Sequence, residues 1–273
     1  MAERASTGLP ANVIWACGSD ENYREKAEPY LKSLVEHGIH PVHFTVDYDL
    51  FDLQARKRDV QDISGVSYII VDSEKFKAKS PINCLQHGDF LYALEEVEGD
   101  PTIVFTDCDI ICQRPLDGME RHMLEWWPEH TVGVQWNNGE GDSLLHEAIR
   151  LQPKHQLDQG LSCFQWIRHP MYMPAFNTGV IVARKSTYQR FYESYCQAWP
   201  IVEQLFSHYA KQQWLLCYLF TYLGLTSDIL SESFHTHGCF SMVRPNPKRF
   251  SVGIDKQLRV NEDVVLLRHN WNV

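Results

Sequence analysis

Short apolar runs alternate with longer amphipathic ones through the first part of the chain, and this alternation most constrains the fold. The run from Asn12 to Cys17 predicts a buried strand, and the segment after it predicts a helix with Tyr30 on its apolar face that stops at Gly38. Two further strands are expected at Pro41–Val46 and Ser67–Val71. Strands that alternate with helices form a mostly parallel, doubly wound sheet with helices on both faces.

A continuous apolar run at Thr102–Thr106 is typical of a strand in the middle of such a sheet. A helix is expected before it, at Ile82–Val97, and a loop later, at Asn137–Asp142. The remaining expected elements are strands at Val132–Trp136, Asn177–Ala183 and Val264–Leu267, and aromatic-rich helices from Thr187 to about Leu223. The chain is therefore expected to form one α/β domain.

The charge balance argues against a polyanionic partner. The chain has 25 Lys and Arg residues against 35 Asp and Glu residues, a formal net charge of −10, which disfavours a nucleic-acid acceptor. No apolar run is long enough for a membrane helix, and the first residues do not resemble a signal peptide. The eight cysteines lack paired CxxC spacing and are expected to be reduced core thiols, so a cytoplasmic protein is expected.

An acidic pair, Asp107 and Asp109, follows the Thr102–Thr106 strand directly. Ligands bind at the carboxyl ends of strands in open α/β sheets, and residues two apart in a strand share a face. Two carboxylates there predict a site for a divalent cation, although acidic residues also end many strands without binding a metal.

A histidine near the end of the sequence is the second candidate ligand. His269 belongs to the Arg268–Trp271 segment that directly follows the strand expected at Val264–Leu267. A lone histidine in such a place is more often structural, but beside an Asp-x-Asp pair it predicts a third metal ligand. Imidazole together with carboxylates favours Mn²⁺, with Mg²⁺ as the alternative because Mg²⁺ prefers an all-oxygen shell.

Several short segments of the sequence, the acidic pair and His269 among them, resemble those of the retaining GT-A glycosyltransferases of the glycogenin and lipooligosaccharide galactosyltransferase kind. The segments similar to that family, in the same order, are Ala16–Tyr23, Ile103–Ile110 with Pro115–Leu116, Phe176–Val182, and the Gln212–Gln213 pair, followed by His269. The resemblance implies a GT-A-like domain at residues 12–273 after a disordered lead-in at 1–11, with a nucleotide-binding half at 12–110 and an acceptor half at 111–273.

The same resemblance implies a role for each matching residue. Asp107, Asp109 and His269 would hold the cation, and Gln212 or Gln213 would lie near the reacting carbon of the sugar, with the choice between them open. Lys79 or His87 would replace an arginine that the family carries before the Asp-x-Asp pair, and Lys248 or Arg249 its missing diphosphate-binding lysine. The residues expected to bind the nucleotide and donor sugar are Gly18, Asp20, Asn22, Tyr23, Cys108, Asn177 and Thr178.

The resemblance therefore implies transfer of a sugar from a UDP-sugar to a hydroxyl acceptor, with retention at the anomeric carbon. The acceptor is open between a glycan, a protein, a small molecule and, less favoured, a modified nucleic acid, and the sequence carries no signal for the oligomeric state. Two alternatives remain: a degenerate nucleotide-sugar-binding protein, and an Asp-x-Asp phosphatase. A glycoside hydrolase is disfavoured because its two carboxyl groups stand about 5–9.5 Å apart on either side of the scissile bond.

Overall fold

The computed structural model describes most of the residues around the central sheet. The described ranges are 8–19, 24–47, 63–72, 97–136 and 176–205, with the shorter stretches 215, 219, 223, 226–230, 234–236, 250–252, 258–260, 263–264 and 266–269. The helix expected at Ile82–Val97, apart from its last residue, and the loop expected at Asn137–Asp142 lie outside these ranges, as does most of the helical region expected after Leu205.

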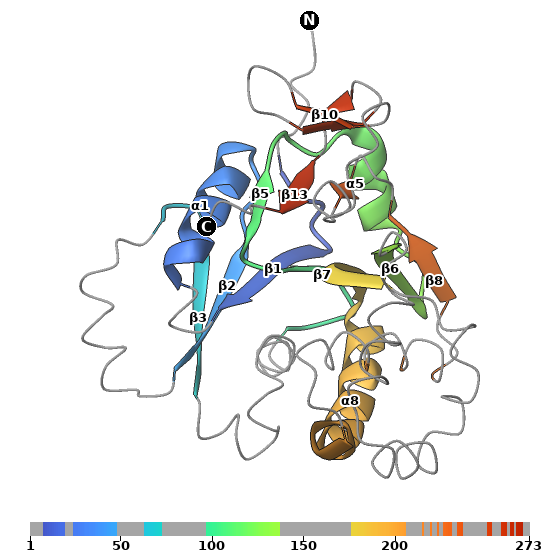
Figure 1. Cartoon of the computed structure of the whole chain (residues 1–273). Coiled ribbons are helices and arrows are strands. Elements are labelled where there is room, and N and C mark those ends of the chain that lie inside the picture. The colour runs from blue at the N-terminus through green and yellow to red at the C-terminus, as the bar shows by residue number, and fades with distance from the viewer. Residues whose placement is uncertain are drawn as a thin grey trace, which may run out of the picture.

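A seven-stranded sheet in the order β3-β2-β1-β4-β7-β6-β8 forms the centre of the molecule (Figure 1). Strands β3, β2, β1 and β4 are parallel to one another, β7 is antiparallel to both of its neighbours, and β8 is parallel to β6. The mostly parallel sheet predicted from the sequence is confirmed. The strands of this sheet are β1 (Val13–Ser19), β2 (Val42–Asp47), β3 (Ser67–Asp72), β4 (Thr102–Thr106), β6 (Thr131–Trp136), β7 (Phe176–Arg184) and β8 (Thr226–Ile229).

Helices cover both faces of this sheet. Helices α1 (Arg24–Glu36) and α5 (Gly118–Glu125) contribute to one core cluster with alternate residues of β1, such as Trp15. Helix α8 (Lys185–Leu205) lies on the other side (Figure 1) and carries Tyr188 in its first turn, where the ring is buried and the hydroxyl bonds to β7. A strand packed on both faces needs apolar residues at successive positions, which explains the continuous apolar runs in β1 and β4.

The first helix stops where the sequence predicts it. Gly38 has a φ of 77°, in the left-handed region that residues with a Cβ adopt only at a cost. Its N–H donates to the carbonyl of Val35 at 3.0 Å, and the N–H of Ile39 donates back to Leu34 at 2.9 Å. These bonds satisfy carbonyl groups that the end of the helix would leave unpaired, and the chain turns directly into β2.

The strand expected at Val264–Leu267 is wrong in its bounds. Two separate short strands occupy this region, β12 (Asp263–Val264) and β13 (Leu267–His269). Leu266 and Leu267 are both fully buried, which a regular strand with one core face cannot achieve for adjacent residues. The chain therefore bends between the two strands. β12 joins a three-stranded sheet with β10 (Phe250–Val252) and β11 (Leu258–Val260), and β13 joins another with β5 (Ile110–Cys112) and β9 (His235–Thr236).

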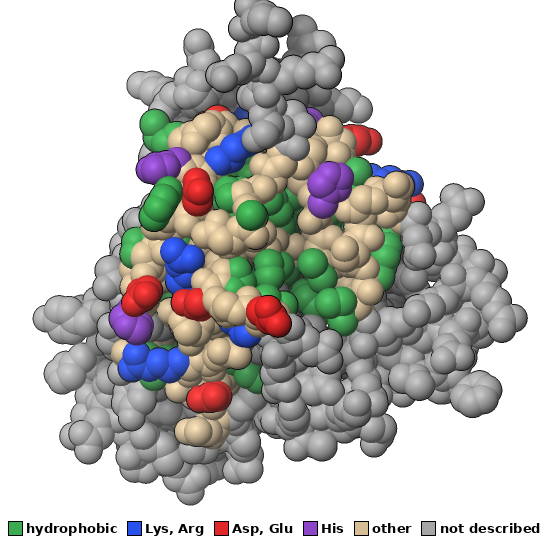
Figure 2. Space-filling model, turned by 180° about the vertical axis from the view of Figure 1, so that it is seen from behind, with side chains coloured by type: hydrophobic (Ala, Val, Ile, Leu, Met, Phe, Trp, Pro, Cys, Tyr) green, Lys and Arg blue, Asp and Glu red, His purple; other side chains and the backbone are tan. Residues whose placement is uncertain are grey.

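The chain joins the fold slightly before residue 12. Leu9, within the expected lead-in, packs against the core, and the carbonyl of Pro10 accepts the N–H of Val13 at 3.0 Å. Among the described residues, no helix combines the length and apolarity that crossing a membrane requires. On the face seen in Figure 2, acidic and basic side chains of the described residues are interspersed, so that this part offers no extended positive area for a polyanion.

Candidate functional site

The Asp107–Asp109 turn begins where the central strand β4 ends. β4 is buried along its whole length, and the N–H of Asp107 donates to the carbonyl of Gly179 in β7 at 2.8 Å. Cys108 is buried, whereas Asp107 and Asp109 are half-buried, and the Oδ1 atom of Asp109 is itself withdrawn from solvent. The turn thus holds two acidic side chains, partly removed from water, at the carboxyl edge of the parallel strands.

The end of β1 lies at the same edge of the sheet. β1 and β4 are parallel, with Cys17 opposite Thr106. Gly18 directly follows Cys17, and Asp107 directly follows Thr106, so Gly18 and Asp107 lie at neighbouring positions. The structure thus brings the backbone of Gly18 close to that of Asp107.

The start of β7 reaches this edge from the other side. β7 runs antiparallel to β4 with Val180 opposite Thr106, so the residues before Val180 extend past the end of β4. The backbone of Asn177 and Thr178 belongs to this extension, and Asn177 pairs with Gln135 of β6. The backbone of both residues therefore lies at the same edge as the acidic turn.

The third predicted metal ligand comes back to the same turn through strand pairing. β13 is antiparallel to β5, with His269 opposite Ile110 and Leu267 opposite Cys112. Ile110 directly follows Asp109, so the backbone of His269 lies beside the exit of the acidic turn. The structure describes the backbone of His269 but not the position of its imidazole ring.

Nine predicted site residues lie outside the described part of the chain. They are Asp20, Asn22, Tyr23, Lys79, His87, Gln212, Gln213, Lys248 and Arg249. Their roles remain predictions, whereas the described backbone unites Gly18, the acidic turn, the start of β7 and His269.

Buried thiols surround the base of this site. Burial raises the pKa of Cys17 well above its usual range, and the nearby Cys108 and Asp107 raise it further. Cys17 is therefore a neutral thiol at neutral pH and is not a nucleophile. Among the described cysteines, Cys17, Cys108 and Cys112 are buried thiols that form no disulfide, which confirms the expectation of reduced core thiols for these three.

A polar network beneath the acidic turn was not predicted from the sequence. Tyr30, expected only as part of an apolar helix face, donates its hydroxyl to Thr106 Oγ1 at 2.6 Å and accepts the indole N–H of Trp15 at 2.9 Å. A buried tyrosine hydroxyl group needs a hydrogen-bond partner, so the sequence could have indicated that Tyr30 forms such a bond. The sequence does not identify the partner. The carbonyl of Gly179, which holds Asp107, carries no side-chain signal at all.

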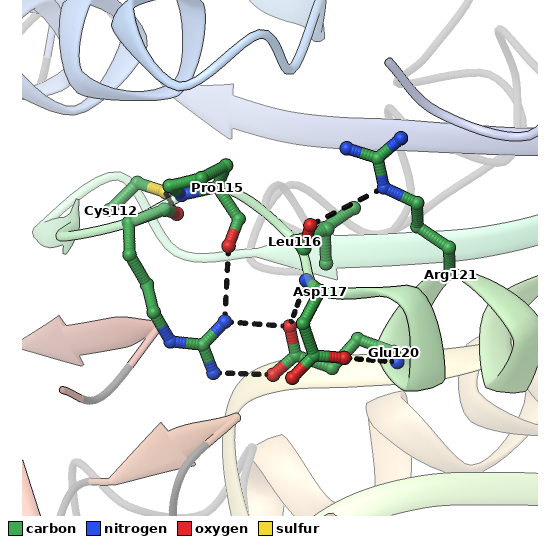
Figure 3. Close-up of polar contacts among 7 residues, drawn as sticks. Cys112, Pro115, Leu116, Asp117, Glu120 and Arg121 are labelled. Atoms are coloured by element: carbon green, nitrogen blue, oxygen red, sulfur yellow. Dashed lines mark hydrogen bonds and ion pairs between the residues drawn. The ribbon is translucent and has the colours of Figure 1, made fainter. Parts of the chain in front are cut away.

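The chain leaving the site is fixed by a second network, drawn in Figure 3. Arg114 forms two hydrogen bonds with the carboxylate of Glu120, at 2.6 and 2.7 Å, and Glu120 also accepts the N–H of Asp117 at 2.9 Å. Asp117 in turn accepts the N–H of Glu120 at 2.8 Å, which completes a capping box at the start of α5. The hydrogen bonds to Glu120 raise the pKa of Arg114, against the opposing effect of burial. This network anchors the segment between β5 and α5.

The donor atoms at the edge suit a hard divalent cation. Among the described side chains, no three His, Cys, Asp or Glu residues form a metal-binding group, and the imidazole of His269 is not one of these side chains. Asp107 and Asp109 offer carboxylate oxygens of the kind that Mg²⁺ and Mn²⁺ bind, and their partial burial reduces competition from bulk water. The residues present therefore fit a cation of this class.

Comparisons with known proteins find similarity only at the level of structure. No family model matches the sequence, and no curated protein matches it. Mouse xyloside xylosyltransferase 1, in its apo form, is 14% identical with a TM-score of 0.51, and the match covers 97% of this chain and 98% of that one.

Two structures of the galactosyltransferase LgtC are also similar. The complex with donor and acceptor sugar analogues is 14% identical with a TM-score of 0.48, covering 95% of this chain and 87% of that one. An active-site mutant of LgtC is 13% identical with a TM-score of 0.47, covering 96% and 88%. Among these structures only the mouse enzyme exceeds a TM-score of 0.5, and at 14% identity its similarity concerns the fold alone: the chain has a GT-A-like α/β fold.

Proposed function

We propose that this chain is a metal-dependent glycosyltransferase that moves a sugar from a UDP-sugar to a hydroxyl acceptor with retention at the anomeric carbon. The observation that carries the proposal is the meeting of four segments at one edge of the sheet: Gly18, the Asp107–Asp109 turn, the start of β7 and the backbone of His269. Ligands bind at this edge in open α/β sheets. The fold likeness to a xylosyltransferase supports the same reading.

In this proposal Asp107, Asp109 and His269 hold a divalent cation, Mn²⁺ in preference to Mg²⁺. The bound cation supplies positive charge that stabilises the leaving diphosphate. The two carboxylates, held by a strand end that is itself fixed to β7, bind without large rearrangement because β4 is already buried and bonded on both sides. Such preorganisation is what an electrostatic site needs.

The remaining roles follow from the family resemblance. The turn of Asp20, Asn22 and Tyr23 after β1 binds the uracil and ribose, and Asn177 faces the donor sugar. Gln212 or Gln213 supports the positive charge that develops at the reacting carbon while the acceptor hydroxyl attacks from the same face. Both a hexose and a pentose are compatible with this arrangement.

A screen of nucleotide sugars with and without Mn²⁺ tests the proposal. The transferase is expected to gain thermal stability with one UDP-sugar only when Mn²⁺ is present, and to hydrolyse that donor slowly in the absence of an acceptor. A nucleotide-sugar-binding protein would show the shift without hydrolysis. Cleavage of phosphomonoesters in place of UDP-sugars would identify a phosphatase, and either result would refute the transferase assignment.

A further inference from the structure

Helix α1 contacts the chain on both sides of the acidic turn through two side chains one turn apart. Tyr30 is fully buried and Ser33 has only 8% exposure. Residues three apart lie on the same side of a helix, so the two hydroxyl groups face the same neighbours. These neighbours are the end of β4, before the turn, and β5, after it.

The hydroxyl of Tyr30 fixes the chain immediately before the acidic pair. It donates to Thr106 Oγ1 at 2.6 Å while it accepts the indole N–H of Trp15 at 2.9 Å. The hydroxyl of Thr106 in turn donates a hydrogen bond to the carbonyl of Ala16 at 3.3 Å. Because Thr106 directly precedes Asp107, these hydrogen bonds connect α1, β1 and β4 next to the first residue of the acidic pair.

The hydroxyl of Ser33 fixes the chain after the pair. Its Oγ accepts the N–H of Cys112 at 3.0 Å and donates to the carbonyl of Tyr30 at 2.7 Å. Cys112 belongs to β5, whose other edge pairs with β13 and so carries the backbone of His269. A hydrogen bond at Ser33 therefore orients the strand that connects Asp109 to the third predicted ligand.

Apolar packing alone would not require these hydroxyl groups. Trp15, Tyr30 and Cys112 belong to one hydrophobic cluster, in which phenylalanine and alanine would fill the positions of Tyr30 and Ser33 but would leave the indole N–H of Trp15 and the backbone N–H of Cys112 without these acceptors. A fully bonded polar network inside a core instead fixes one geometry, because each hydrogen bond is directional and costly to break. The network therefore adds geometric definition at the place where the acidic turn is attached.

We propose that Tyr30 and Ser33 are positioning residues whose hydroxyl groups, acting through Thr106 and Cys112, set the spacing of Asp107 and Asp109 for cation binding. This role rests on the proposed function, since it concerns the same cation. Neither residue touches the cation or the donor in this account. Their removal is expected to weaken cation binding without abolishing the fold.

The test compares Tyr30→Phe with a matched control, Tyr188→Phe. Tyr188 is equally buried, and its hydroxyl donates to the carbonyl of Ile181 at 3.0 Å, but it belongs to α8 on the other face of the sheet. Mn²⁺ affinity is measured by electron paramagnetic resonance of the free ion, and thermal unfolding is measured in parallel. Tyr30→Phe is expected to weaken Mn²⁺ binding about 10- to 100-fold, the usual effect of losing a group that orients a metal ligand. Tyr188→Phe is expected to lose thermal stability and to bind Mn²⁺ as the wild type does.

A second pair of variants separates the hydroxyl group of Ser33 from its volume. Ser33→Thr and Ser33→Val have nearly the same shape, and only the threonine keeps an acceptor for the N–H of Cys112. Threonine is expected to retain Mn²⁺ affinity and valine to lose it. Wild-type affinity in both Tyr30→Phe and Ser33→Val, or an equal loss in Tyr188→Phe, would overturn the positioning role alone. A wild-type protein that binds no Mn²⁺ would overturn the proposed function, and the positioning role with it.

Discussion

In the antiparallel pairing of β13 with β5, His269 lies directly opposite Ile110, which is the residue after Asp109. The pairing joins the last described strand of the chain to the turn after its central strand. It depends on the bend that separates β12 from β13, because a single strand at Val264–Leu267 would have ended before His269. The backbone of His269, the predicted third ligand, therefore lies near the acidic pair because of the short strand β13, whose bounds were not predicted from the sequence.

The close packing of Gly133 against Trp127 predicts a strong effect of one added methyl group. A Cβ at Gly133 would lie 2.5 Å from a ring atom of Trp127, a side chain with only 1% exposure. Gly133→Ala is expected to lower the free energy of unfolding by about 1–3 kcal/mol, because neither the strand nor the buried ring has room to move. Urea unfolding measures the loss.

Gly118→Ala is the matched control for that substitution. A Cβ at Gly118 would meet nothing within 4 Å, and the residue begins helix α5. Alanine there is expected to leave the stability unchanged or to raise it by up to about 1 kcal/mol, following helix propensity. Equal destabilisation by both substitutions would contradict the packing described around Trp127.

The ion pair of Arg114 and Glu120 predicts a non-additive response. The two side chains retain 21% and 9% of their exposure, so removal of one leaves the other charged and poorly solvated. Arg114→Met and Glu120→Leu are each expected to cost about 1.5–3 kcal/mol in unfolding free energy, the range for hydrogen bonds to charged groups. The double variant is expected to cost clearly less than the sum, since it leaves no unpaired charge. Strict additivity in a double-mutant cycle would argue against this pairing.

The buried thiol of Cys112 predicts a loss of stability at alkaline pH. Burial raises its pKa from 9.0 to about 12, while a backbone hydrogen bond with Arg114 and the positive charge of that residue oppose the shift. Above pH 9 the unfolded chain releases this proton and the folded chain keeps it. The thiol's contribution to stability is therefore complete below pH 9, and it falls by up to about 1.4 kcal/mol per pH unit as the pH rises towards 12.

Cys112→Ser removes this titration and keeps a group of similar size that can donate to the carbonyl of Arg114. Unfolding free energies at pH 8, 9.5 and 10.5 are expected to fall less steeply for the serine variant than for the wild type. Other groups that titrate in this range are shared by both proteins and cancel in the comparison. Parallel pH dependence would show that the thiol is not buried as described.

The parallel half of the fold could be predicted because its strands are buried on both faces. β4 has the predicted bounds, and β2 and β3 differ from their predicted bounds by one residue at one or both ends, since continuous apolar runs bounded by polar residues leave little choice of bounds. β5 was not predicted as a separate strand, because three residues directly after the acidic turn have no period of their own.

The candidate site divides in the same way. The place of Asp107 and Asp109 at the carboxyl end of the central strand could be predicted, because they follow a recognisable strand. The hydrogen bonds of Tyr30 and Ser33 could not, because their partners lie in β4 and β5, and only the fold brings these strands to the helix. A buried hydroxyl group indicates that a partner exists, whereas tertiary structure decides which one it is.

The central claim is that the acidic pair binds a divalent cation together with a nucleoside diphosphate. Titration of Mn²⁺ in the presence of UDP, for wild type and Asp109→Asn, tests it most directly. Asp100→Asn serves as the control, since Asp100 accepts hydrogen bonds from Ser186 away from this edge. The wild type and Asp100→Asn are expected to bind Mn²⁺ equally, and Asp109→Asn is expected to bind it roughly 100-fold more weakly while keeping its fold by circular dichroism. Undiminished Mn²⁺ binding by a folded Asp109→Asn protein would contradict the account.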